Sequence, residues 1–200
     1  MARNFQFDPS KLKAVILYVC GKFAPAHLGA VKMHKILYFS DMIHYVNFGR
    51  PLTGATFRKR QLGPTCDQLL SSLSELEKDG QLKIEEVNYF GFLKTQFIPL
   101  IPPDTSAFNE SELLLLNEVV DFVCLNNTAK SISEFSHNMA WEIANFGEVL
   151  EYKSAYRLYP TQVSPEAMVW AGVEGRDLVD PTKTEQMVYT DFETFRNRVP

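Results

Sequence analysis

The chain has little cysteine: Cys20, Cys66 and Cys124 stand far apart in 200 residues. They form no CxxC pair and no Cys/His spacing typical of a zinc site, and the four histidines contain no HExxH pair. These absences predict reduced thiols in a cytoplasmic protein without a metal site. A reactive thiol at Cys66 remains a hypothesis, because this residue lies near the start of a predicted helix, where the pKa of a thiol is often lowered.

Phosphate-binding loops and long apolar runs are missing as well. The sequence contains neither GxxxxGK(S/T) nor GxGxxG, whose backbone amides hold nucleotide phosphates, and we predict no cofactor. No apolar run reaches the ~18 residues of a membrane span, and the first residues lack the apolar core of a signal peptide. A net charge of -4 offers no excess of Lys and Arg for broad nucleic-acid binding. We therefore expect contact with neither membrane nor nucleic acid.

Apolar and aromatic side chains are abundant. Hydrophobic residues make up 46% of the chain, and 15 Phe and 8 Tyr supply large surfaces for a core or an interface. The carboxylates are scattered along predicted helices, without a paired arrangement for acid–base catalysis. This composition predicts one packed domain over residues 8–158, a C-terminal extension over 159–200, and a partner-binding protein rather than an enzyme.

Apolar spacing predicts a predominantly helical α+β fold with a small antiparallel sheet or hairpin. Asp8-Pro9 is a typical helix start, and Asn109 followed by Glu112 has capping-box spacing. Gly63-Pro64 is expected to end a basic extended segment. The predicted helices cover 9–21, 26–48, 65–78, 110–125, 128–136, 139–155 and 184–198, and the predicted extended segments cover 52–62, 81–87 and 92–100.

A helix over 65–78 followed by a hairpin is also the order of elements at the end of a winged-helix domain. This order keeps a second class open, a DNA-binding transcriptional regulator. The helix ends in SELEKDG and is more acidic than basic, whereas DNA-reading helices usually present Arg, Asn or Gln to base edges. A protein partner is therefore the first expectation and DNA the alternative.

Two segments carry a family resemblance. The first is KMHKILYFSDMIHYVNFGRPLTGATFRKRQLGP over residues 32–64, and the second is SEFSH over residues 133–137, followed by Trp141. In this order they resemble the SocA-like Panacea antitoxin domain, which has an LxKLLYFxD helix, a GRPL turn, a strand ending in GP, and an LSxxSHxxxxW segment. The matching positions are Lys35, Leu37, Tyr38, Phe39, Asp41, Gly49, Arg50, Pro51, Leu52, Gly63, Pro64, Ser133, Ser136, His137 and Trp141.

The resemblance implies an antitoxin that binds a cognate protein toxin and blocks it; some relatives also hand their toxin to a bacterial protease. It implies structural roles for Lys35, Gly49, Pro51, Gly63, Pro64, His137 and Trp141. We expect Tyr38, Asp41, Arg58 and Arg60 to contact the partner, since Tyr and Arg are enriched in binding hot spots. The segment Arg58-Lys59-Arg60 stands where many relatives are apolar, and it suits either an acidic partner or protection of a strand edge.

Overall fold

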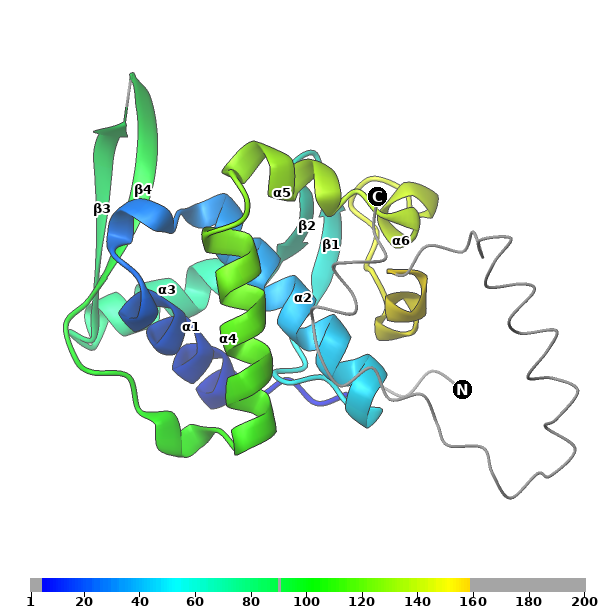
Figure 1. The fold of residues 1–200 in the computed structure, drawn as a ribbon, viewed down its shortest axis with the longest axis horizontal. Coiled ribbons are helices and arrows are strands. Elements are labelled where there is room, and N and C mark those ends of the chain that lie inside the picture. Colours follow the sequence, from blue (N-terminus) through cyan, green and yellow to red (C-terminus); the bar gives the residue numbers. More distant parts are fainter. Residues whose placement is uncertain (1–4, 90, 159–200) are drawn as a thin grey trace, which may run out of the picture.

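Helices make up most of this computed structural model, which describes residues 5–89 and 91–158 (Figure 1). Two small antiparallel sheets complete it, so the predicted helical α+β class is confirmed. In chain order the described elements are α1 (Pro9–Lys22), η1 (Pro25–His27), α2 (Ala30–Phe48), β1 (Phe57–Arg60), β2 (Gly63–Cys66), α3 (Leu69–Lys78), β3 (Leu82–Tyr89), β4 (Phe92–Pro99), η2 (Thr105–Ala107), α4 (Glu110–Cys124), α5 (Ala129–Phe135), α6 (Met139–Ile143) and η3 (Tyr152–Arg157).

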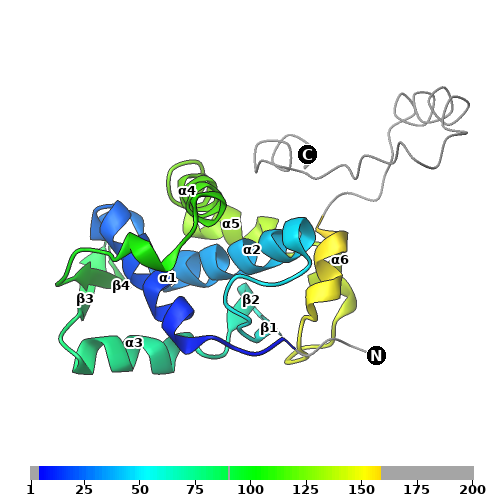
Figure 2. The ribbon, with the colours of Figure 1, turned by 90° about the horizontal axis from the view of Figure 1, so that it is seen from below.

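The helix α2 runs through the middle of the molecule. Figure 2 shows it between α4 on one side and the β1–β2 sheet on the other. Most of its apolar side chains, from Met33 to Ile43, are buried although they point in several directions, which explains why the sequence shows no single apolar face. The helix ends at Gly49, which has a φ of +69° and donates its N–H to the Tyr45 carbonyl at 2.8 Å. Glycine takes this left-handed conformation without steric cost.

The predicted helix starts are confirmed where local capping defines them. Asp8 Oδ1 accepts a hydrogen bond from the Lys11 N–H at 2.9 Å, with Pro9 in the first turn of α1. Asn109 and Glu112 form the expected capping box at the start of α4. Each cap satisfies backbone donors that have no partner inside the helix.

The two sheets differ in how far they are embedded. Strand β1 pairs with β2 from Phe57↔Cys66 to Arg60↔Gly63, and this sheet packs against α2. Strands β3 and β4 form the predicted hairpin, which projects from the body of the molecule in Figure 1. Only the first sheet therefore brings motif residues against the central helix.

Four predicted elements are wrong in their extent. The extended segment expected over 52–62 forms a strand only from Phe57 to Arg60. The helix expected from residue 26 begins at Ala30, because residues 25–27 form a separate 3-10 turn. The helix expected from residue 65 begins at Leu69, because Gly63-Pro64 starts a second strand instead of ending the first one. The helix expected over 139–155 stops at Ile143. The predicted helix over 184–198 and the extension over 159–200 lie outside the described residues.

The shortening of α6 has a specific cause in backbone pairing with β1. Gly147 N–H donates to the Lys59 carbonyl, and Lys59 N–H donates to the Glu148 carbonyl, both at 3.0 Å. Leu150 N–H then donates to the Phe57 carbonyl at 2.8 Å. These bonds take the backbone groups that a longer helix would use internally.

Within residues 5–89 and 91–158, no helix is both long and apolar enough to cross a membrane.

Candidate functional site

The two motif segments, far apart in sequence, meet at Gly63. This glycine has a φ of +91°, and a Cβ atom placed on it would lie 2.2 Å from Ser136 Oγ and 2.8 Å from Lys35 Nζ. Lys35 belongs to α2 in the first segment, and Ser136 follows α5 in the second. Both the backbone conformation and the lack of space therefore require glycine here. We call Lys35, Gly63, Pro64, Ser136, His137 and Trp141 the motif junction.

Lys35 ties α2 to the β1–β2 sheet from inside the protein. Its side chain is 1% exposed, and its Nζ donates to the Pro64 carbonyl at 2.9 Å. Burial lowers the pKa of Lys35 to about 7, because an ammonium group loses solvation when it leaves water. The lysine is thus partly neutral near physiological pH, which lowers the cost of burying it as a hydrogen-bond donor between α2 and β2.

The second segment also holds the turn between the two strands. Ser133 Oγ donates to the Leu62 carbonyl at 2.9 Å, and Ser136 Oγ donates to the Ser133 carbonyl at 2.6 Å. Both serines are buried. The hydroxyls in the SEFSH segment therefore donate to backbone carbonyls, and the bond to Leu62 fixes α5 against the β1–β2 turn.

His137 and Trp141 cover the other side of this turn. Their rings stack with centroids 3.8 Å apart at an interplanar angle of 11°. Trp141 Nε1 donates to the Arg60 carbonyl at 3.1 Å, and Lys59 Nζ lies 4.0 Å from the centroid of the Trp141 ring. Burial and the charges of Lys35 and Lys59 lower the pKa of His137, with Glu134 and the Gln61 backbone opposing. The imidazole is therefore neutral at pH 7 and stacks on the Trp141 ring as an uncharged group.

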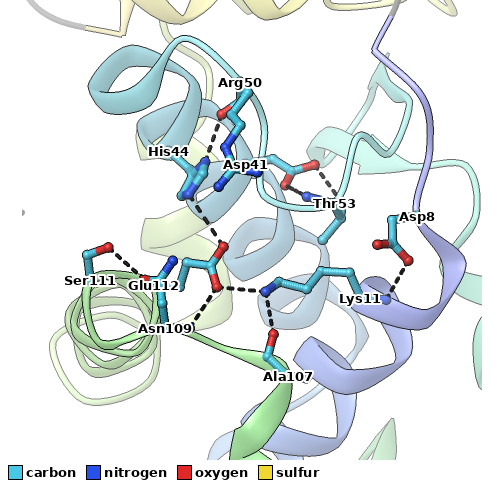
Figure 3. A network of polar contacts seen from close by, with 10 residues as sticks. All are labelled: Asp8, Lys11, Asp41, His44, Arg50, Thr53, Ala107, Asn109, Ser111 and Glu112. Atoms are coloured by element: carbon cyan, nitrogen blue, oxygen red, sulfur yellow. Dashed lines mark hydrogen bonds and ion pairs between the residues drawn. The ribbon is translucent and has the colours of Figure 1, made fainter.

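Asp41 anchors the chain just after the GRPL turn (Figure 3). It accepts hydrogen bonds from Thr53 N–H at 2.6 Å, Thr53 Oγ1 at 2.7 Å and Tyr152 Oη at 2.8 Å. Burial raises the pKa of Asp41 to about 6, although the bonds from Thr53 and Tyr152 oppose this rise. His44 Nδ1 lies 2.7 Å from the Arg50 carbonyl and adds a second tie to the turn. The GRPL segment is thus shaped by buried polar groups of α2.

A third polar contact joins α1 and α4 beside this turn. Lys11 Nζ lies 2.7 Å from Glu112 Oε2, and His44 Nε2 lies 3.8 Å from Glu112 Oε1 (Figure 3). Burial opposes ionisation of Glu112, but hydrogen bonds from Lys11 and Asn109 lower its pKa. Burial lowers the pKa of His44, so this imidazole is neutral at pH 7 and its approach to Glu112 is no ion pair. The sequence predicted only the capping role of Glu112.

Burial corrects the expectation that Tyr38 and Asp41 contact a partner. Both are 0% exposed, because they sit on the face of α2 that meets the β1–β2 sheet and the following turn. Burial also raises the pKa of Tyr38, so its hydroxyl stays protonated. These two residues support the fold, whereas Arg58 and Arg60 reach the surface.

Exposed apolar side chains of residues 139–149 lie on the chain segment that pairs with the strand of the two arginines. Arg58 Nε lies 2.6 Å from Asp67 Oδ2, and another of its nitrogens donates to the Gly147 carbonyl at 3.1 Å. The Arg60 guanidinium lies 5.8 Å from the centroid of the Phe146 ring, and Phe146 is 70% exposed. We call this surface the α6 face; its members are Arg60, Met139, Ile143, Phe146 and Val149, of which the four apolar ones are exposed large side chains.

The other candidate chemistries receive no support from the geometry. Cys66 ends β2 just before α3, and burial raises the pKa of its thiol to about 12 against opposing hydrogen bonds from the Gln68 and Leu69 backbone, so the structure gives the reactive-thiol hypothesis no support. Within the part of the chain that the structure describes, no three His, Cys, Asp or Glu residues gather as a metal site. The exposed residues of α3 include Ser71, Ser74 and Glu75 but no arginine, which does not favour DNA reading.

Comparison with protein families identifies the family of this chain. Residues 33–142 match the family described as "Antitoxin SocA-like, Panacea domain". The matched range covers both motif segments and more than half of the 200-residue chain. Comparisons with curated proteins and with solved structures return no match.

Proposed function

Because this chain belongs to the SocA-like Panacea antitoxin family, we propose that it neutralises a cognate protein toxin by binding it directly through the α6 face. The family gives it an antitoxin-type, regulatory role with a toxin or other protein as its partner. The finer elements of the proposal are direct complex formation, the surface used, and action in the cytoplasm.

The exposed contact between Arg60 and Phe146 is the observation that carries the proposal. An aromatic side chain that is 70% exposed and lies beside an arginine combines two residue types favoured at the centres of binding interfaces. Ile143, which is 61% exposed, and Val149 extend the apolar area. Covering these side chains would remove apolar surface from water, which favours association.

The surroundings of the α6 face hold it in a defined conformation. Trp141 Nε1 fixes the Arg60 backbone, and residues 147–150 pair with β1. A surface that is ordered before binding loses less conformational entropy on association. The motif junction therefore helps to hold the α6 face in place through Trp141. An antitoxin that covers the active site of a toxin blocks it by binding alone and needs no catalysis of its own.

The test is co-expression with the product of the adjacent gene, if that product arrests growth. We expect growth to be restored and a complex to co-purify. Arg60→Glu and Phe146→Ser should abolish rescue and co-purification while the thermal unfolding of the antitoxin stays unchanged. Leu70→Ser is the matched control, because Leu70 is an equally exposed apolar residue, at 75%, on the distant helix α3 (Figure 1).

The same strains separate direct blocking from other routes. Rescue without any association, or rescue that survives both α6-face variants, would contradict the proposal. Delivery of the toxin to a bacterial protease would shorten the toxin's lifetime in cells, and a chase with and without the antitoxin measures it. Salt-sensitive binding to DNA upstream of the gene pair would instead support a transcriptional regulator.

A further inference from the structure

A pocket of about 480 Å³ lies at the start of α2, at the opposite end of this helix from the GRPL turn. Its walls come from η1, the first turn of α2, strand β4 and the loop between α4 and α5. Figure 1 shows β4 beside the start of α2, and β4 contacts both η1 and α2. The β4 residues that line the pocket, Leu93, Lys94 and Thr95, lie in the half of the hairpin next to its turn. None of the residues that line the pocket belongs to the α6 face or to the motif junction.

Two lysines give the pocket its charge. Lys32 Nζ donates to the Cys124 carbonyl at 3.0 Å, and Lys94 Nζ donates to the Ala26 carbonyl. Both acceptors are neutral carbonyl groups. His27 also lines the pocket, whereas none of its lining residues is Asp or Glu. The wall is therefore cationic although the whole chain carries a net charge of -4.

The charge of Lys94 acts on Lys32 across the pocket. Burial lowers the pKa of Lys32, and the charge of Lys94 lowers it further against an opposing effect of Cys124. Burial likewise lowers the pKa of Lys94. A bound anion would relieve the repulsion between these lysines and restore their ordinary basicity, which favours its binding.

Other groups in the pocket fit the rest of such a ligand. The backbone of Gly29 and Ala30 lines it where α2 begins, and Gly29 supplies no side-chain cap to the first N–H groups of this helix. Leu28, Val31 and Leu93 add apolar surface, and Leu93 is 79% exposed. The volume lies within the roughly 300–1,000 Å³ typical of small-molecule sites.

We propose that this pocket binds a small phosphate-bearing molecule, with the phosphate held by Lys32 and Lys94 and an apolar part of the ligand against Leu93. Lysine is a common phosphate ligand because it is a compact charge with several donors. The inference is independent of toxin binding, since no member of the α6 face lines the pocket.

Calorimetric titration of the purified full-length chain tests the proposal with three probes: ADP, inorganic pyrophosphate and adenosine. We expect ADP and pyrophosphate to bind and adenosine not to bind. ADP binding tighter than pyrophosphate binding indicates an organic phosphate ligand, and equal binding indicates a free phosphate compound; both support the phosphate site. Binding of adenosine as tight as that of ADP would overturn the proposal, and so would no binding of ADP and pyrophosphate.

Four variants connect the binding to the pocket. Lys32→Gln and Lys94→Gln should each weaken phosphate binding by about tenfold or more, because each removes a charge-assisted hydrogen bond. Lys32→Arg should retain binding. Lys83→Gln, which removes an exposed charge from the neighbouring strand β3, should bind like the unaltered chain. Circular dichroism checks that each variant is folded. If Lys32→Gln unfolds, the binding measured for Lys94→Gln tests the site in its place. Unchanged binding in the folded glutamine variants would refute the site.

Discussion

The motif junction and the α6 face adjoin each other but differ in almost every physical respect. The motif junction is built on a buried lysine, a glycine with no room for a Cβ atom, and a buried serine that donates to a backbone carbonyl. The α6 face consists of apolar side chains in water around Arg60. The sequence motif that identifies the family lies mainly in the first region, and the exposed side chains Ile143 and Phe146 belong to the second.

This difference suggests how one domain can serve different partners. Substitutions in the motif junction would disturb close contacts between α2, the β1–β2 sheet and α5. Substitutions of Ile143 or Phe146 would change the binding surface while leaving those contacts intact. On this account the motif maintains the scaffold, and the exposed side chains determine the partner. The following variants test the separation, from the largest expected effect to the smallest.

Gly63→Ala should be the most damaging single change in the motif junction. The methyl group would collide with Ser136 Oγ and Lys35 Nζ at a φ of +91°, so both overpacking and backbone strain apply. We expect the free energy of unfolding to fall by about 3–5 kcal/mol in urea titrations. Gly80→Ala is the control: its φ is +68° but nothing lies within 4 Å of the added Cβ, so a loss of about 1–2 kcal/mol is expected. Equal losses would contradict the packing argument.

Asp41→Asn should destabilise the GRPL turn. The amide nitrogen would face donors from Thr53 or Tyr152 that now donate to a carboxylate oxygen. We expect a loss of about 2–3 kcal/mol in the free energy of unfolding, since a buried donor is left without an acceptor. Glu75→Gln, which affects only the exposed ion pair with Lys13, should cost less than about 1 kcal/mol. An Asp41 variant as stable as this control would exclude an anchoring role.

Lys35→Met should change the pH dependence of stability. The pKa of Lys35 is about 7 in the folded chain against 10.5 for an unperturbed lysine. Between these values the unfolded chain binds more protons, so the stability of the unaltered protein rises with pH. Relative to Lys35→Met, its free energy of unfolding should therefore increase from pH 7 towards pH 10. A difference that stays flat or falls over this range would mean that Lys35 remains fully charged inside the fold.

Trp141→Phe should have the smallest effect on stability among these changes. It keeps an aromatic ring for stacking on His137 but removes the hydrogen bond from Nε1 to the Arg60 carbonyl. We expect a loss of about 1 kcal/mol, measured by thermal unfolding. Toxin binding should weaken as well, because the lost bond holds Arg60 of the α6 face directly, whereas an added Cβ atom on Gly63 would meet Ser136 and Lys35. If toxin binding by Trp141→Phe were unchanged, the α6 face would not depend on the hydrogen bond from Trp141 to Arg60.

Local chemistry explains which parts of the fold could be predicted from the sequence. Asp8 and Asn109 define helix starts through hydrogen bonds to residues three positions away, and Gly49 ends α2 through its own conformation. Such signals are contained in a few neighbouring residues. The extent of α6 could not be read in this way, because residues 147–150 pair with β1, which is distant in sequence.

The candidate site was harder to predict for the same reason. Tyr38 and Asp41 are residue types common at interfaces, but the surroundings of α2 bury them completely. Gly63 was expected to shape a strand end, whereas its contact with Ser136 depends on how α5 packs. Phe146 carries no motif signal and becomes noticeable only because the structure exposes it beside Arg60. Motifs located the scaffold, and only the fold located the surface.

The most direct test measures toxin affinity and the free energy of unfolding on the same two purified variants, Phe146→Ser and Gly63→Ala. We predict that Phe146→Ser weakens binding by at least about tenfold with stability unchanged within about 0.5 kcal/mol. Gly63→Ala should lose stability yet bind normally at a temperature where it is folded. A folded Gly63→Ala that cannot bind, together with a Phe146→Ser that binds normally, would contradict the division between scaffold and binding surface.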